Sequence, residues 1–185
     1  SILSWGRDNF GQVSNTPTSN GFVHASGGSR HSVALKSDLP PGFNWFPNAA
    51  NGHYYALTGP MTWDQAKAEA DAQGPSVELV TIRSASQNNW LASTLITTNA
   101  WIGFTDEAVE GTWVWRSGDP VTFTNWDPQE PNNYGVGENA GLTNHNQAGV
   151  WNDGGPPENP GLQVPAIIEY SKVDGDDDGL SDADE

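Results

Sequence analysis

Residues 130–138 read Glu-Pro-Asn-Asn-Tyr-Gly-Val-Gly-Glu, and residues 151–153 read Trp-Asn-Asp. Together they gather the carboxylates of Glu130, Glu138 and Asp153 with the carboxamides of Asn132 and Asn152. Ca²⁺ prefers hard oxygen donors of this kind and takes six to eight of them. A carboxamide has a further use, because its oxygen can hold a metal while its NH₂ group donates to a ligand hydroxyl. The pattern predicts a calcium site suited to the vicinal hydroxyls of a sugar.

Composition excludes several classes of function. The chain has 185 residues with 23 acidic and 7 basic side chains, a formal net charge of −16. Such a surface repels phosphate backbones, so we predict no nucleic-acid partner. No apolar run approaches the roughly 20 residues that span a bilayer, so we predict no membrane insertion. The chain has no cysteine and begins with Ser, and we expect it to be a segment of a longer polypeptide.

Four segments follow one another along the chain. Residues 1–38 are rich in Gly, Ser and Asn and low in charge. Pro40-Pro41-Gly42 interrupts regular secondary structure and marks a linker over 39–50. Residues 51–171 alternate helical and strand patterns, and 172–185 form an acidic tail. Within 51–171 we expect helices after Thr62 and Ser84, and strands over 53–57, 77–82, 101–104, 112–115, 150–151 and 165–170. From 117 to 149 we expect irregular loop, and long loops of this kind are usually functional.

The ordered set of motifs over 51–171 resembles a C-type lectin-like domain. The set consists of the helix with Trp63 and Ala66, the Trp101-Ile102-Gly103 strand, the Glu-Pro-Asn tripeptide and Trp151-Asn152-Asp153. The resemblance implies an α+β fold, in which two helices flank small antiparallel sheets and a long calcium-binding loop region. It also implies a principal Ca²⁺ and sugar site formed by Glu130, Asn132, Glu138, Asn152 and Asp153, with a cis peptide between Glu130 and Pro131. The Glu-Pro-Asn form implies glycans of the mannose, glucose or fucose type.

The resemblance also implies a second Ca²⁺ site. Its ligands would be Asp106, Glu110 and Asn133, with Glu138 shared. The family often has Asp where this chain has Asn133, and losing that charge should weaken the ion. The family usually has two disulfides, and the corresponding positions here hold Ala70, Ile168 and Ala140, with the fourth lost in the 154–160 loop. We expect apolar packing to replace them.

The two flanking segments resemble other repeats. Ser4-Trp5-Gly6-Arg7-Asp8 and the Gly27–Leu35 run are similar to part of one repeat of the regulator-of-chromosome-condensation propeller family, the alternative being a Gly-rich β linker. The tail matches an EF-hand calcium loop and resembles a thrombospondin type 3 or dockerin-like repeat. Its candidate ligands are Asp174, Asp176, Asp178, Leu180, Asp182 and Glu185. The alternative for the tail is a solvated acidic linker.

Two other functions compete with sugar binding. A pair of carboxylates could serve a glycoside hydrolase, but here they are mixed with Asn in the pattern of a metal shell, so we predict no enzyme. A protein-binding or structural adhesion module is the stronger alternative, because a fold does not fix a function. The complete ligand set favours sugar binding, with weak single sites made effective by multivalency. The propeller-like repeat, the cysteine-free lectin-like domain and the acidic calcium loop together suggest a large extracellular or cell-surface protein, secreted and of bacterial origin.

Overall fold

The computed structural model describes residues 22–27, 32–36 and 39–171. The chain divides into two compact units, Ser1–Gly42 and Phe43–Glu185. In the first unit, β1 (Phe22–Gly27) pairs antiparallel with β2 (Ser32–Lys36). A single hairpin does not distinguish a propeller-like repeat from a Gly-rich linker, so that resemblance stays a prediction. The candidate calcium loop of the tail lies outside the described residues.

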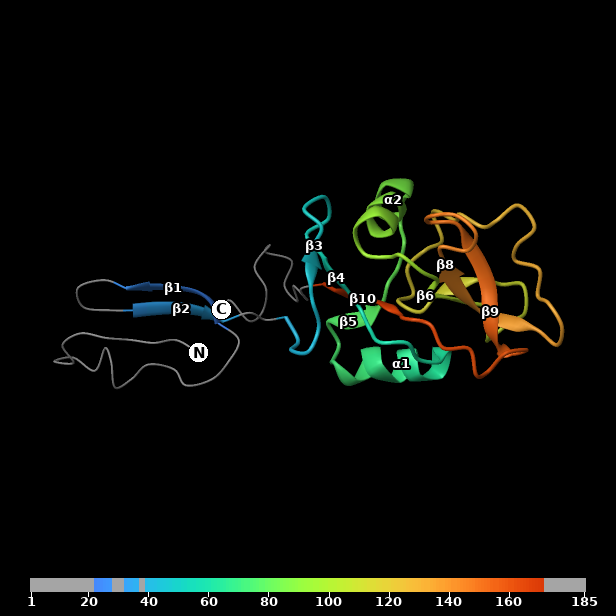
Figure 1. The fold of residues 1–185 in the computed structure, drawn as a ribbon, viewed down its shortest axis with the longest axis horizontal. Coiled ribbons are helices and arrows are strands. Elements are labelled where there is room, and N and C mark those ends of the chain that lie inside the picture. The colour runs from blue at the N-terminus through green and yellow to red at the C-terminus, as the bar shows by residue number, and fades with distance from the viewer. Residues whose placement is uncertain (1–21, 28–31, 37–38, 172–185) are drawn as a thin grey trace. The chain divides into compact units, whose positions relative to one another are not determined.

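The second unit contains two four-stranded antiparallel sheets (Figure 1). The first sheet has the order β3 (Phe46–Pro47), β4 (Tyr54–Leu57), β10 (Ile167–Tyr170) and β5 (Val77–Leu79). The second has the order β7 (Val114–Trp115), β6 (Ala100–Thr105), β8 (Glu138–Thr143) and β9 (Trp151–Pro157). β10, the last strand of the described residues, therefore pairs with β4, near the start of this unit, and closes the domain.

Two helices flank these strands, and each begins at a side-chain cap. Thr62 precedes α1 (Trp63–Ala72), and its hydroxyl and the Gln65 side chain form a reciprocal capping box. Ser84 caps α2 (Ala85–Thr94) by accepting from the backbone N–H of Gln87. In Figure 1 the two helices lie on opposite sides of β4, β5 and β10. This arrangement confirms the α+β fold with two helices and small antiparallel sheets.

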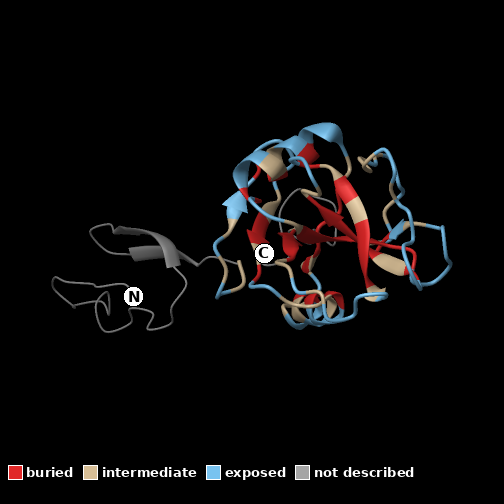
Figure 2. Ribbon diagram, turned by 45° about the vertical axis from the view of Figure 1, so that its right-hand side comes forward, coloured by how far each residue is buried: buried red, intermediate tan, exposed pale blue. Residues whose placement is uncertain are grey.

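Aromatic side chains dominate the core. Trp101, Trp151 and Phe104 are completely buried, and Phe104 stacks on Trp115 with ring centroids 4.3 Å apart. Figure 2 shows burial concentrated in the strands, with exposed residues along the outer loops and helix faces. The positions that carry cysteine in the resembled family, Ala70, Ala140 and Ile168, are also completely buried. Apolar packing thus fills these positions.

The expectation of irregular structure from 117 to 149 is wrong for Glu138–Thr143, which forms β8. Its sequence, Glu-Asn-Ala-Gly-Leu-Thr, has weak strand propensity. β8 pairs with β6 on one side and β9 on the other, and such pairing on both edges overrides local preference. β9 also continues to Pro157, well beyond the Val150-Trp151 strand that the sequence predicts, whereas β5 ends at Leu79 instead of Ile82. No described helix has the length and apolar character needed to cross a membrane.

Candidate calcium and sugar site

The candidate ligands lie on two neighbouring strands and on the loop that leads into one of them. Glu138 is the first residue of β8, while Asn152 and Asp153 belong to β9. In the antiparallel register, Leu142 faces Asn152 and Gly141 faces Asp153. Glu130 and Asn132 come from the irregular segment before β8. The strand pairing therefore brings residues from both ends of the sequence motif to one region of the domain.

Asp153 anchors the Glu-Pro-Asn loop to the sheet. Its side chain is completely buried, and its carboxylate accepts from the backbone N–H groups of Asn132 at 3.1 Å and Asn133 at 2.7 Å. The Glu130-Pro131 peptide just before them is cis, as the resemblance implies. The loop backbone is thus held by a side chain that is itself a candidate ligand.

Two buried oxygen atoms in this region have no hydrogen-bond partner: Oε2 of Glu130 and Oδ1 of Asn152. The Nδ2 group of Asn152 donates to the backbone oxygen of Asp153, which leaves Oδ1 of the same carboxamide free. An unpaired buried oxygen is costly unless a cation or a donor satisfies it. These two atoms therefore fit a hard cation.

The carboxylates of the site also repel one another. Burial and the nearby carboxylate of Asp153 raise the pKa of Glu130 to about 7. Burial and the charges of Asp153 and Glu158 raise the pKa of Glu138 above its usual value, although the N–H of Tyr134 donates to its Oε2 at 3.1 Å. Carboxylates crowded in this way are stabilised by a bound cation.

The candidate metal ligands include both carboxylates and carboxamides. Within the described residues, no group of three or more His, Cys, Asp or Glu side chains is placed to hold a metal by itself. A metal here would consequently depend on the carboxamide oxygens of Asn132 and Asn152 as well as on carboxylates. Six to eight oxygen ligands drawn from both types are usual for Ca²⁺, so the donor set fits this ion.

Residues of the predicted second site are brought together in two pairs. Asp106 is buried, and burial raises its pKa, with a further contribution from the nearby carboxylate of Glu110. In the other pair, Oδ1 of Asn133 accepts from the backbone N–H of Glu138 at 2.8 Å. A carboxamide oxygen has two lone pairs, so this hydrogen bond leaves one of them for a metal, and Asn133 stays a predicted ligand.

Sequence reasoning missed Asn139, whose backbone contacts Thr105, the residue before Asp106. The Thr105 hydroxyl donates to the backbone oxygen of Asn139 at 2.6 Å. Oδ1 of Asp106 and Oδ1 of Asn139 are both buried without a hydrogen-bond partner, so Asn139 is a further candidate oxygen donor for a second site. Its position directly after Glu138 could have indicated this residue in the sequence. A second missed residue, Glu158, became visible only through the pairing of β8 with β9.

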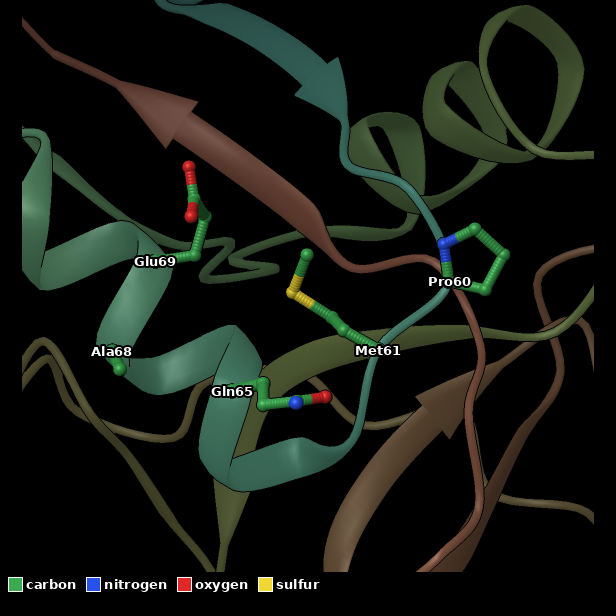
Figure 3. A pocket seen from close by; sticks show the side chains of 5 residues that line it. All are labelled: Pro60, Met61, Gln65, Ala68 and Glu69. Atoms are coloured by element: carbon green, nitrogen blue, oxygen red, sulfur yellow. The ribbon is translucent and has the colours of Figure 1, made fainter.

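Other candidates lie elsewhere. His145, a loop residue that could stack on a sugar face, follows the end of β8 opposite to Glu138, so it is not part of this region. An open pocket on the α1 side of the domain is lined by Pro60, Met61, Gln65, Ala68 and Glu69 (Figure 3). Its two polar side chains are already engaged, because Gln65 accepts from Thr62 and Glu69 accepts from Gln73. We assign no binding function to this pocket.

Known proteins share this fold and parts of this sequence. The low affinity immunoglobulin epsilon Fc receptor of Mus musculus is 40% identical over 101 residues, which is 54% of this chain and 29% of the receptor. Lectin BRA-3 of Megabalanus rosa is 32% identical over 105 residues, which is 56% of this chain and 64% of that lectin. The chain thus spans less than two thirds of the length of either relative.

Solved structures agree with these relatives. The cow C-type carbohydrate-recognition domain of CD23 superposes with a TM-score of 0.60 and 25% identity, over 73% of this chain and 98% of that domain. A calcium-independent type II antifreeze protein gives a TM-score of 0.59 at 23% identity, over 73% and 95%, which shows likeness of fold alone. The model of the lectin C-type domain matches residues 59–156, more than half of the chain. This chain belongs to the C-type lectin domain family.

Proposed function

We propose that residues 51–171 bind a glycan of the mannose type through a calcium ion held by Glu130, Asn132, Glu138, Asn152 and Asp153. Membership of a family of non-enzymatic, carbohydrate-binding domains supports sugar binding over catalysis. The observation that carries the calcium assignment is the pair of unpartnered buried oxygens on Glu130 and Asn152. One comes from the loop and the other from β9, and both belong to residues next to Asp153 in space or in sequence.

Each side chain has a distinct part in binding. Calcium, when bound, supplies positive charge and coordination positions for two vicinal hydroxyls. The carboxamides of Asn132 and Asn152 donate hydrogen bonds to the hydroxyl oxygens. The carboxylates of Glu130 and Glu138 accept hydrogen bonds from the hydroxyl groups. Hydrogen bonds to charged groups contribute roughly 1.5–3 kcal/mol each, but desolvation removes most of this. We expect a dissociation constant near 1 mM, about −4 kcal/mol, for a single sugar, so useful binding would need several modules.

Selectivity rests on the Glu-Pro-Asn sequence. The resemblance assigns equatorial 3- and 4-hydroxyls to this form. The cow CD23 domain, which shares the fold, was crystallised in the presence of a GlcNAc₂Man₃ oligosaccharide. Exchanging donor and acceptor with Glu130→Gln and Asn132→Asp should shift preference from mannose towards galactose. Retained mannose preference in the double variant, measured by competition with both sugars, would contradict this assignment of selectivity.

Retention on immobilised mannose tests the function directly. The full chain should bind in calcium and elute when a chelator is added. Asn152→Ala should not be retained, while Asn89→Ala, an exposed carboxamide on α2, should behave like the wild type. Because the acidic tail is intact in all three proteins, a difference between them belongs to the lectin domain. A folded wild type that passes through unretained would reject mannose binding.

A protein ligand is the second candidate function. Tyr134 and Val136 are 69% and 75% exposed on the loop before β8, and exposed aromatic and apolar side chains are common in protein-binding surfaces. One relative is named as a receptor for immunoglobulin epsilon Fc. Calcium binding without retention on mannose, galactose or fucose would favour this alternative. An extracellular or cell-surface setting is part of the same proposal and is supported by the receptor and lectin relatives.

A further inference from the structure

Glu158 lies just beyond the end of β9 and contacts the loop before β8 twice. Its backbone N–H donates to the oxygen of Gly137 at 2.8 Å. Its side chain accepts from the backbone N–H of Val136 at 2.9 Å. The turn that carries Glu158 is itself closed by a hydrogen bond from Asn159 N–H to the oxygen of Gly155 at 2.6 Å. Main chain and side chain of one residue therefore hold the same loop.

The Glu158 carboxylate fills the space that a side chain at Gly135 would need. A Cβ built on Gly135 would lie 2.2 Å from Oε2 of Glu158 and 2.3 Å from its carboxyl carbon. Gly135 also has a φ of +69°, a conformation that glycine adopts without strain. Glycine at this position thus allows the loop to pass closely under the carboxylate.

The loop held by Glu158 joins the two halves of the candidate calcium site. It follows Asn132 and Asn133, which are anchored on Asp153, and it ends at Glu138. Between these two ends, Val136 N–H is the point at which the Glu158 side chain attaches. A loop fixed at its ends and in its middle keeps Asn132 and Glu138 at a constant separation, which lowers the ordering cost of binding an ion.

We propose that Glu158 is a positioning residue for calcium, acting through Val136 and Gly137 rather than as a ligand. This inference rests on the proposed function of the site. Glu158 itself is exposed, so its effect should be modest. Loss of one hydrogen bond of this kind corresponds to about a fivefold weaker calcium affinity.

Calcium titration of the full chain by calorimetry tests the proposal with two variants of one residue. Glu158→Ala removes the acceptor for Val136 N–H and should weaken calcium binding about fivefold. Glu158→Gln removes the charge but keeps an oxygen that can accept the same hydrogen bond, and should stay within about twofold of the wild type. Asp71→Ala, which removes an exposed carboxylate at the end of α1, controls for net charge and should change nothing.

Gly135→Ala tests the same contact from the other side. The new methyl group meets the Glu158 carboxylate, so this substitution should weaken calcium binding more in the wild type than in Glu158→Ala. Strain from the positive φ is common to both backgrounds and cancels in the comparison. Equal effects in the two backgrounds would overturn the proposal, as would equal losses in Glu158→Ala and Glu158→Gln, which would indicate a charge effect.

Hydrogen exchange separates failure of this inference from failure of the proposed function. In the absence of calcium, the amide of Val136 should exchange faster in Glu158→Ala than in the wild type and at the wild-type rate in Glu158→Gln. If the wild type bound no calcium, the proposed function would fall, but this exchange pattern would still support the positioning of the loop by Glu158. Unchanged exchange in Glu158→Ala would overturn it.

Discussion

Oδ2 of Asp153 accepts a hydrogen bond from the backbone N–H of Asn133 at 2.7 Å. Because Oδ1 accepts in the same way from Asn132, one buried carboxylate fixes two consecutive peptide groups of the Glu-Pro-Asn loop. Burial raises the pKa of Glu130 and of Glu138, and the charge of Asp153 adds to the rise in both. Asp153 therefore links the shape of the loop to the charge of the site.

Asp153→Asn should abolish the stabilisation of the lectin domain by calcium. The carboxamide offers one oxygen where two N–H groups need acceptors, and it removes a negative charge from the shell. With calcium at 100 times its dissociation constant, the wild type should gain about 2.7 kcal/mol in free energy of unfolding. Urea unfolding with calcium and with chelator measures the gain in both proteins. A variant that gains as much as the wild type would contradict the role of Asp153.

Glu169→Gln should destabilise the domain without touching the sugar site. Glu169 is 1% exposed, and its carboxylate accepts from Tyr55 at 2.9 Å, from Arg83 at 2.9 Å and from the N–H of Thr81 at 3.1 Å. His53 Nδ1 lies 2.5 Å away. A carboxamide would direct its NH₂ group at these donors, so we expect a loss of about 3 kcal/mol. Calcium affinity should be unchanged, and a large drop would show that the network reaches the site.

The same carboxylate predicts a pH dependence of stability. Hydrogen bonds with His53 and Thr81 and the charge of Arg83 hold the pKa of Glu169 below its usual value of 4.5, although burial opposes them. The unfolded chain therefore binds the proton more readily, and stability from this group is complete above pH 4.5 and lost as pH falls through the lowered pKa. Glu78 and Asp119, which also contact Arg83, are present in both proteins, so their contribution cancels in the comparison. The difference between wild type and Glu169→Gln should consequently shrink in acid, and a constant difference would contradict this.

Gly103→Ala should destabilise the domain where β6 of the second sheet packs against β5 of the first. A Cβ at Gly103 would lie 2.7 Å from the backbone oxygen of Leu79 and 3.0 Å from that of Val80. Neither atom can move without separating the strands, so we expect a loss of about 1–3 kcal/mol. Gly59→Ala meets nothing within 4 Å and is the matched control. Denaturation midpoints measure both, and equal midpoints would show that the strands yield easily.

A disulfide between positions 140 and 155 should form and stabilise the domain. A Cβ built on Gly155 would lie 3.6 Å from Cβ of Ala140, within the usual range for disulfides. Closing a loop of about 15 residues contributes about 3 kcal/mol in the chain-entropy model. Gly155 has a φ of +79° and its Cβ would approach Trp101 at 3.1 Å. Comparing the oxidised and reduced forms of Ala140→Cys/Gly155→Cys cancels much of that strain, and an oxidised form no more stable than the reduced one would refute the prediction.

Local signals made most of the fold predictable. Thr62 and Gln65 form a capping box within four residues, so the start of α1 could be placed from sequence. The Glu-Pro-Asn and Trp-Asn-Asp motifs likewise located the candidate site, because each motif is contiguous. The hydrogen bonds of Asp153 to the loop backbone were not predicted, because they depend on how the loop folds against β9.

Features that depend on strand register were not predictable in this way. β8 has few strand-forming residues and owes its structure to its neighbours β6 and β9. The contact of Glu158 with Val136 follows from that register and leaves no local pattern. Glu169 lies within the strand that the sequence predicts over 165–170. Its partners Tyr55 and Arg83 are distant in sequence. Hydrogen-bond networks of this kind become visible only in three dimensions.

Anchoring of the Glu-Pro-Asn loop by Asp153 has a kinetic consequence. A loop whose backbone is already fixed does not have to fold around an arriving ion. The speed of calcium capture should then be set by how fast the ion sheds its water, and the amplitude of any slow conformational phase should be small. A domain of this kind would respond to changes in calcium concentration as fast as the ion itself can enter and leave.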